Sequence, residues 1–432
     1  MEQTERSLNL HCVASTPQYH TSITPSGSGV KSPDTVEDTR TAEERGAPPI
    51  SSNYFKSAEW SADGTTVITN SADNCIRSFV LPPDLLDEHQ QPQELSPYYS
   101  VPSSEPINAL ALYPWYSLDD ASTTIVLSSV RDHPIRLTSA LYPGTVASYS
   151  LISPTTEEFI SPHSILYPQG LGGTKFLTGS DSLICLFDVS RPGKDGPISR
   201  LPTIPSKRKK IVGGGVGMKG IISTMAVNPT GDGILAAGTF TRHIGLYASN
   251  GAGDMIGTFS VAGTEADRHI GGKGVTQVLW SSCGRYLFVA ERRSTGILVY
   301  DIRVTGQLVG WLEGRNATTN QRLKVDIVAG SDSSPEEIWA GDIDGFVRVW
   351  EDPTAVAGGK KPFIEVRLHD DPVSSAVVHP MGSVLATCSG QKQFSPVDDA
   401  EAREHDDTEE GRVGGNDVFQ RKVDNSLKIW AL

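Results

Sequence analysis

A short pattern recurs seven times along this chain and limits its fold more than any other feature does. In each copy a small turn, usually containing Asp, is followed three residues later by Ile, Val or Leu, and three residues later again by an aromatic residue. The copies are Asp73-Ile76-Phe79, Asp132-Ile135-Thr138, Asp181-Ile184-Phe187, Thr241-Ile244-Tyr247, Ser294-Ile297-Tyr300, Asp344-Val347-Trp350 and Asp424-Leu427-Trp430. Only Thr138 departs from the aromatic rule.

A repeated apolar strand that follows a tight polar turn is typical of one strand in each four-stranded blade of a WD-repeat propeller. Seven copies predict an all-β fold, a seven-bladed WD-repeat β-propeller. Aspartate suits such turns because its carboxylate accepts hydrogen bonds from nearby backbone N–H groups. We therefore expect a structural turn role, and not a catalytic one, for Asp73, Asp132, Asp181, Asp344 and Asp424.

The repeats also set the domain boundaries. Residues 1–50 are rich in Ser, Thr and Pro without apolar periodicity, which predicts a disordered tail, and residues 51–432 form the propeller. The copies are roughly 50 to 80 residues apart, longer than a standard repeat, so we expect insertions, including an acidic one at about 391–423. The chain ends two residues after Trp430. We therefore expect residues 51–56 to supply the outer strand of the last blade.

Charge and cysteine content narrow the class of protein. The chain has 51 acidic and 37 basic residues among 432, a formal charge of −14, so contact with nucleic acid requires a local basic patch. The five cysteines are widely separated, without zinc-ligand or redox spacing, which favours free thiols in a reducing compartment. The N-terminal region lacks the apolar segment of a signal peptide, and no run is long enough to cross a bilayer. We expect a cytoplasmic or nuclear protein without membrane contact.

The chain contains no enzyme motif that stands up to inspection. Residues 215–220 read G-x-G-x-x-G, but a strand-like segment follows, and a dinucleotide site needs a helix N-terminus at that point. Walker A, G-x-S-x-G, H-E-x-x-H and paired-cysteine motifs are absent from the sequence. We therefore predict a non-enzyme with no cofactor, no metal, no small-molecule substrate and no catalytic residue.

A compact basic run lies between the third and fourth blades. It consists of Lys207, Arg208, Lys209 and Lys210. Such a run is either a nuclear import signal, a phosphate contact or an ordinary solvated loop. The sequence leaves these interpretations open.

The turns before the repeated strands emerge on one face of a propeller, and in three blades they are basic. The residues concerned are Arg131 and His133 in blade two, Arg242 and His243 in blade four, and Arg292 and Arg293 in blade five. Such an arc could hold a phosphate backbone, with arginine planes stacking on unpaired bases. The alternative is that these are ordinary exposed charges.

Several segments outside the generic repeat resemble the telomerase Cajal body protein family. The matching segments keep the family's order between about Asn53 and Trp350, and they are Asn70–Asn74 with Arg77 and Leu81–Pro83, Trp115–Leu118, Arg131–Ile135, Ser190–Asp195, Gly220–Ser223, Gly245–Tyr247 and Thr318–Arg322. The acidic insertion is not a hallmark of that family, and the basic run lies where the family's loop is variable.

The resemblance implies a non-enzymatic RNA-binding scaffold for small nuclear and Cajal-body RNAs and telomerase RNA, assisting the localisation or assembly of their ribonucleoproteins. It adds Arg322 to the candidate RNA-binding residues, and implies partner RNP proteins, folding by the cytosolic chaperonin, and a nuclear, also cytoplasmic, location. The alternative is a protein-only scaffold, such as a pre-mRNA splicing factor or a ubiquitin-ligase adaptor.

Overall fold

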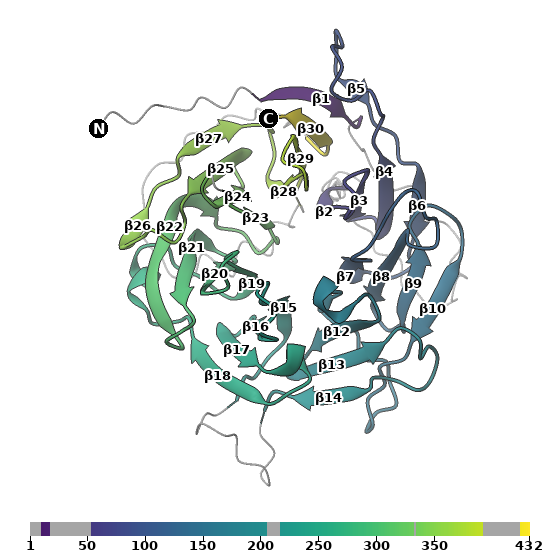
Figure 1. Ribbon diagram of the computed structural model, residues 1–432, viewed down its shortest axis with the longest axis vertical. Helices are drawn as coiled ribbons and strands as arrows, with labels where there is room; N and C mark the ends of the chain where they lie inside the picture. Colours follow the sequence, from purple (N-terminus) through teal and green to yellow (C-terminus); the bar gives the residue numbers. More distant parts are fainter. Residues whose placement is uncertain (1–9, 18–52, 205–216, 332–333, 392–423) are drawn as a thin grey trace, which may run out of the picture.

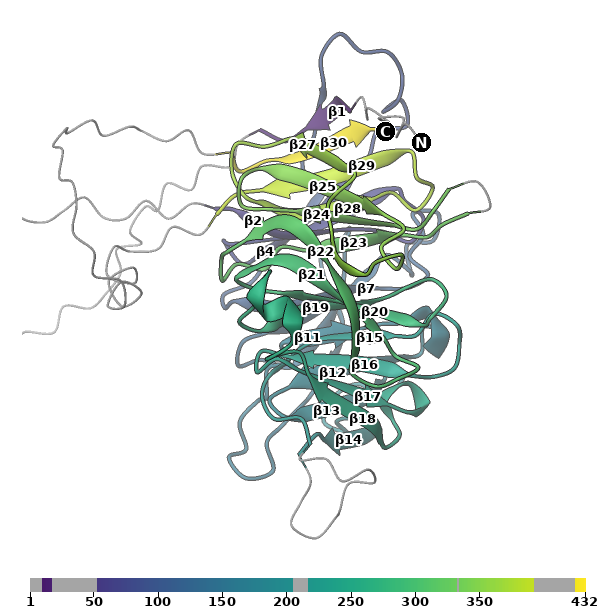
Figure 2. The same cartoon turned by 90° about the vertical axis from the view of Figure 1, so that its left-hand side faces the viewer.

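A computed structural model describes residues 10–17, 53–204, 217–331, 334–391 and 424–432. Within these ranges the chain forms seven sheets of mainly antiparallel strands, which are arranged radially around a central channel (Figure 1). In the side view the strands run across the thickness of the ring (Figure 2). The predicted all-β, seven-bladed propeller is confirmed.

Each blade is a sheet whose first strand lies at the channel and whose last strand lies at the outer edge. The first four blades are β2 (Phe55–Trp60), β3 (Thr66–Ser71), β4 (Cys75–Val80) and β6 (Tyr99–Pro102); β7 (Ile107–Leu112), β8 (Ile125–Val130), β9 (Ile135–Ser139) and β10 (Thr145–Tyr149); β11 (Ser164–Leu166), β12 (Lys175–Ser180), β13 (Leu183–Asp188) and β14 (Ser199–Pro202); and β15 (Ile222–Val227), β16 (Leu235–Thr239), β17 (His243–Tyr247) and β18 (Met255–Ser260).

The last three blades include two additional edge strands. They are β19 (Val275–Trp280), β20 (Tyr286–Glu291), β21 (Ser294–Asp301), β22 (Gln307–Ala317) and β26 (Gly358–Lys360); β23 (Val325–Val328), β24 (Glu337–Gly341), β25 (Phe346–Glu351) and β27 (Ile364–Arg367); and β28 (Val373–Val378), β29 (Val384–Ser389), β30 (Leu427–Ala431), β1 (His11–Ser15) and β5 (Gln93–Glu94). Three short 3₁₀ helices, η1 (Gln169–Leu171), η2 (Ser249–Gly251) and η3 (Glu265–Arg268), lie in the connections.

The repeated pattern falls on the third strand of every blade, and its spacing explains how the blades pack. Residues three apart on a strand point to opposite faces. On β4, Ile76 accordingly packs with blade two and Phe79 with blade seven. On β13, Ile184 packs with blade four and Phe187 with blade two. One strand therefore supplies core residues to both neighbouring interfaces.

The turn into the third strand needs a residue in the left-handed backbone region. In blades one to five this residue is Asn74, Asp132, Ser182, Arg242 and Arg293, with φ between 51° and 64°. In blade six it is Gly345, with φ 84°. A polar or glycine residue is tolerated here because larger β-branched side chains clash in that region. The pattern's polar turn is thus a backbone requirement.

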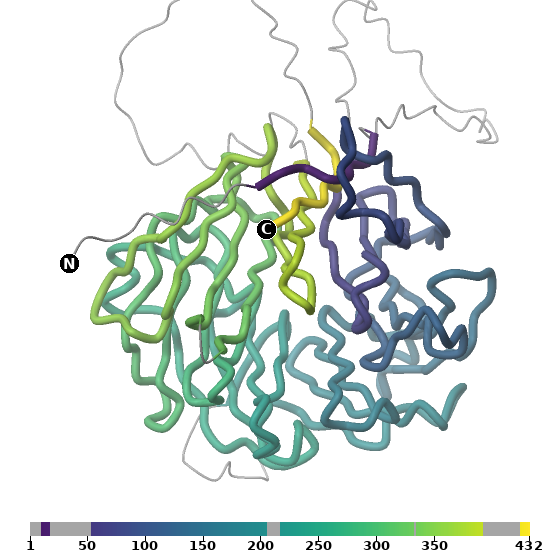
Figure 3. The backbone as a smooth tube through the Cα atoms, turned by 45° about the horizontal axis from the view of Figure 1, so that its top comes forward, coloured from purple at the N-terminus to yellow at the C-terminus, as the bar shows by residue number. Residues whose placement is uncertain are grey.

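The ring closes through the N-terminal end of the chain, but not through the segment predicted. β1 pairs antiparallel with β30, with Cys12 opposite Trp430, and β5 then pairs with β1 (Figures 1 and 3). Phe55 and Lys56 instead belong to β2, the inner strand of blade one. The prediction that residues 51–56 close the ring is therefore wrong, although the last blade does take its outer strand from the N-terminal end of the chain.

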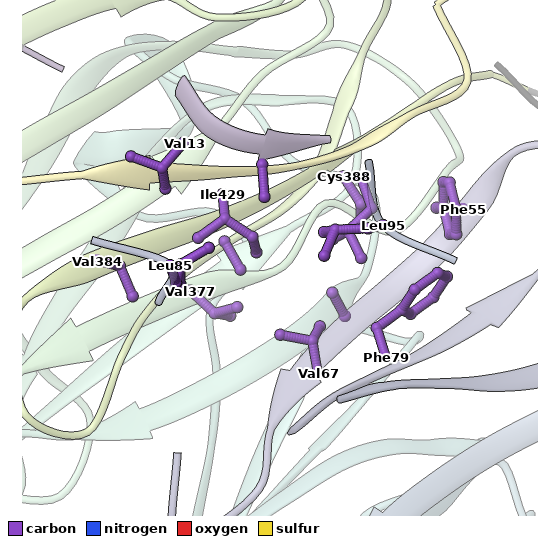
Figure 4. Packing of buried hydrophobic residues seen from close by; sticks show 14 residues of the cluster. Val13, Phe55, Val67, Phe79, Leu85, Leu95, Val377, Val384, Cys388 and Ile429 are labelled. Carbon is purple, nitrogen blue, oxygen red and sulfur yellow. The ribbon is translucent and has the colours of Figure 1, made fainter. Parts of the chain in front are cut away.

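The closing strand packs against side chains from three other parts of the chain. Val13 and Ala14 of β1 pack with Leu85 and Leu95 in the connection between β4 and β6, and with β30 and blade one (Figure 4). Part of the segment expected as a disordered tail is therefore a strand of the propeller. The remainder of 1–50, apart from residues 10–17, lies outside the described residues.

Candidate nucleic-acid interface

The inner strands and the loops above them enclose a central channel with a cavity of about 460 Å³. His163, Ser223, Gln277, Asn320, Arg322 and Lys324 are among the polar residues that line it. The turns between second and third strands and the loops between blades lie at the same end of the blades, because each antiparallel strand reverses direction. This face carries the predicted basic residues.

Two arginines from different blades converge on one aromatic ring at this face. Phe240 follows β16 in blade four; the guanidinium carbon of Arg292 lies 4.7 Å from its ring centroid, and that of Arg322 lies 5.7 Å away. Arg292 donates through Nε to the Lys273 carbonyl at 3.1 Å, and Arg322 donates through Nη2 to the Ser223 carbonyl at 2.8 Å. Backbone carbonyls and the ring thus orient both guanidinium groups.

Arg293 extends this group of cations toward blade six. Its Nε donates to the side-chain carbonyl of Asn320 at 3.0 Å, and its backbone N–H donates to the Thr319 carbonyl. Thr319–Arg322 is one of the segments that carry the family resemblance, and the structure places it directly beside Arg292 and Arg293. We call Phe240, Lys273, Arg292, Arg293 and Arg322 the channel-mouth cluster.

The three arginines of the channel-mouth cluster have no carboxylate partner within the described part of the chain, whereas the charge of Lys273 acts on Asp267. None of its four cationic side chains forms an ion pair among the described residues. The channel wall surrounds Arg322 while leaving it exposed to the channel, and this desolvation, followed by the charge of Arg292, lowers the pKa of Arg322. Neighbouring arginines without a carboxylate partner favour binding of an anion.

Arg242, by contrast, is neutralised by two carboxylates. Its guanidinium bonds Glu291 at 2.7 Å through Nε and also pairs with Asp267. Burial opposes its charge, but these hydrogen bonds raise the pKa of Arg242 overall, while burial raises the pKa of Glu291. Because the Glu291 side chain is only 1% exposed, this network joins blades four and five as part of the fold.

The two predicted histidines support their own turns. His133 Nδ1 lies 2.6 Å from the Arg131 carbonyl, and His243 Nδ1 lies 2.9 Å from the Thr241 carbonyl, so each Nδ1–H donates to a residue two positions earlier. Arg131 is 63% exposed on blade two, with Asp132 4.0 Å away. The structure therefore brings together Arg292, Arg293 and Arg322, and leaves Arg131 and His133 on a separate blade.

The five predicted turn aspartates have different partners. Asp73 accepts from Asn53 and pairs with Arg77, Asp181 accepts from the Ser182 hydroxyl, and Asp344 accepts from Asn316. In blade six the turn N–H groups of Asp344 and Phe346 donate to Asp342 instead.

Asp132 and Asp424 differ most in their exposure to solvent. The Asp132 side chain is 79% exposed, and its backbone N–H donates to Ser161 Oγ. Asp424 is buried and accepts from the backbone N–H of Asp370 at 3.0 Å.

Other sequence expectations fall partly outside the described residues. The run Lys207–Lys210 and the acidic segment 392–423 lie there. The G-x-G-x-x-G match leads into β15, a strand, as predicted. In the described ranges no group of three His, Cys, Asp or Glu residues is placed to hold a metal, and no helix has the length and apolarity to cross a membrane.

Sequence reasoning missed Phe240 and Lys273 as members of the cluster. Phe240 lies two residues before Arg242, the first residue of the basic pair Arg242 and His243, so an aromatic residue near a basic turn was an available signal. Lys273 lies in the loop between blades four and five, and no local pattern marks it.

Comparison with known proteins agrees with this architecture, although no family model matches the chain. Telomerase Cajal body protein 1 of Rattus norvegicus is 30% identical over 351 residues, which is 80% of this chain and 60% of the relative. Guanine nucleotide-binding protein negative regulator 1 of Schizosaccharomyces pombe is 28% identical over 388 residues, 88% of each chain. Protein SWT21 of Kluyveromyces lactis is 26% identical over 356 residues, 76% of this chain and 80% of the relative.

The matched region spans only about 60% of the mammalian relatives' length, yet it covers most of the present chain. The described part of the chain forms a seven-bladed propeller whose third strands carry the repeated pattern. Over most of its own length the chain is therefore similar to the telomerase Cajal body proteins, and it folds as a WD-repeat propeller.

Proposed function

We propose that this chain is a non-enzymatic scaffold that binds small nuclear RNA, of the Cajal-body or telomerase class, through the channel-mouth cluster, and assists localisation or assembly of its ribonucleoproteins in the nucleus. The observation that carries the proposal is the convergence of Arg292 and Arg322 on Phe240 without a carboxylate partner among the described residues. The names of the relatives, which refer to telomerase and the Cajal body, supply the class of RNA.

The geometry suits unpaired RNA. Arginine planes and an aromatic ring offer stacking surfaces for bases, and fixed guanidinium N–H groups bind phosphates. A local cluster is required because the chain as a whole has a formal charge of −14 and repels polyanions elsewhere. Arg131 on blade two would extend the contact, whereas Arg242 contributes by holding blades four and five together.

Closure of the ring supports a second partner, the cytosolic chaperonin. β1 and β30 are near opposite ends of the chain, so the last blade can form only when synthesis is complete. Until then, apolar surfaces of blades one and seven are exposed, which favours assisted folding.

The experiment that tests the proposal is crosslinking and immunoprecipitation from nuclear extract, with sequencing of the recovered RNA. Enrichment of telomerase RNA or guide RNAs is the expected result, and enrichment of spliceosomal RNAs would move the function to splicing. Recovery of no RNA above background, with protein partners retained after nuclease treatment, would contradict RNA binding and leave the protein-only scaffold.

A further inference from the structure

The one departure from the repeated pattern leaves a cavity in the propeller. In the other blades the aromatic residue of the third strand packs toward the preceding blade, as Phe187 does against blade two. In blade two this position is Thr138, and a cavity of about 200 Å³ lies between blades one and two beside it. Ile76, Val101 and Val130 form its apolar wall.

Two polar groups of this cavity have no partner among the described residues. Thr138 is only 6% exposed, and its hydroxyl oxygen forms no hydrogen bond. Arg136, two residues earlier on β9, also lines the cavity, and no carboxylate of the described ranges pairs with it.

The cavity is accessible from the outer edge of the ring. Tyr142 and Gly144, in the turn between β9 and β10, line it and are exposed, with Tyr142 48% exposed. A side chain added at Gly144 would meet no atom within 4 Å, so open space adjoins this residue. Tyr98 and Val146, next in sequence to the lining residues Tyr99 and Thr145, are 58% and 60% exposed.

We propose that this cavity binds a tyrosine side chain in an acidic linear segment of a partner protein. The size fits, because a cavity of about 150 Å³ already accommodates benzene. The same position of the third strand is occupied by Tyr247 and Tyr300 in blades four and five. Arg136 can donate to the phenolic oxygen and to a glutamate or aspartate beside the tyrosine.

The test measures fluorescence anisotropy of a labelled peptide, with one central tyrosine flanked on each side by three glutamates, titrated with the full chain. We expect saturable binding that weakens at least tenfold in Thr138→Phe, which fills the cavity, and at least threefold in Arg136→Gln. The matched control Arg200→Gln, on the outer strand of blade three, should leave binding unchanged.

A peptide with alanine in place of the tyrosine should not bind. The proposal is overturned if the wild-type chain shows no saturable binding, if the alanine peptide binds equally well, or if Thr138→Phe folds and binds like the wild type. Should Thr138→Phe fail to fold, unchanged binding by Arg136→Gln would overturn it instead. These outcomes are independent of RNA binding. The cavity lies at the outer edge of blades one and two, whereas the channel-mouth cluster lies on other blades.

Discussion

His369 Nδ1 lies 3.1 Å from Asp424 Oδ2 in the last blade, and this pair starts a buried chain of hydrogen bonds. His369 Nε2 lies 2.7 Å from the Thr387 hydroxyl, which in turn accepts from Trp430 Nε1 at 2.8 Å. Every donor finds an acceptor when His369 is neutral: Nδ1–H donates to Asp424, and Thr387 donates to Nε2. These hydrogen bonds join the loop before blade seven to three residues of that blade.

Replacing this histidine should destabilise the propeller. In His369→Ala the Asp424 carboxylate and the Thr387 hydroxyl lose a buried partner, so we expect a loss on the order of 3 kcal/mol in the free energy of unfolding. Urea denaturation followed by tryptophan fluorescence measures it. His89→Ala, an exposed site, is the control and should change stability by less than about 0.5 kcal/mol; an equal effect of both variants would contradict the role of the hydrogen-bond chain.

The same site predicts loss of stability in acid. Burial lowers the pKa of His369, so its stabilising contribution is complete above the unfolded value of about 6.5 and is lost as the pH falls below that value. Burial opposes ionisation of Asp424, but its bonds with His369, Ser426 and Asp370 lower the pKa overall, so its contribution is complete above the unfolded value of about 4 and is lost progressively as the pH falls below that value. Lys428 and Asp370 are the nearby charges.

Stability should therefore fall between pH 7 and pH 5 by at most about 1.4 kcal/mol per pH unit for His369 alone. Urea midpoints of the wild type and of His369→Gln at pH 7.5, 6.5 and 5.5 test this. The wild type should lose more stability than the variant over this range. Parallel pH curves would show that the pKa of His369 is not lowered in the folded state.

The buried carboxylate Glu291 should make Arg242 essential for the fold. Arg242→Ala leaves Glu291 buried with one fewer cation, and breaking such a pair costs about 3–5 kcal/mol. Adding Glu291→Gln removes the uncompensated charge, so the double variant should regain much of the stability in urea denaturation. If Arg242→Ala is as stable as the wild type, the pairing does not contribute as described.

The N-terminal strand should be required for a stable ring. Deleting residues 1–17 removes β1 and exposes the edge of β30, with a loss of at least 2–3 kcal/mol from Val13 and Ala14 and a tendency to aggregate. Deleting residues 1–9 keeps β1 and is the control. A synthetic peptide of residues 9–17 should restore the melting temperature of the longer deletion; equal stability of the two deletions would contradict closure by β1.

The local features of the fold were predictable, and the distant pairings were not. The pattern Asp73-Ile76-Phe79 and its six counterparts identify the third strands because strand periodicity and turn chemistry act over a few residues. The closing strand was misplaced because pairing of β1 with β30 joins segments more than 400 residues apart. The short apolar run Leu10, Val13 and Ala14 was the available signal.

The candidate site shows the same division. Basic turns at Arg292 and Arg293 could be found from the sequence, but their relation to Phe240 and Arg322 depends on how three blades meet. In the sequence Arg242 and Arg292 are equivalent basic turn residues. In the structure Asp267 and Glu291, which are 25 and 49 residues from Arg242, neutralise it. Charge compensation by non-local carboxylates is not visible in a linear pattern.

The central claim, RNA binding by the channel-mouth cluster, is tested most directly by equilibrium binding of the purified full chain to an RNA stem-loop recovered by crosslinking, measured over a range of salt concentrations. Arg292→Glu, Arg293→Glu and Arg322→Glu together should weaken binding at least a hundredfold and lower the salt-dependence slope by about two, as expected when three phosphate contacts are lost. Arg285→Glu, in a turn at the opposite end of blade five, should leave affinity within threefold of the wild type. Equal affinity and slope for the triple variant and the wild type, with both folded, would contradict the account.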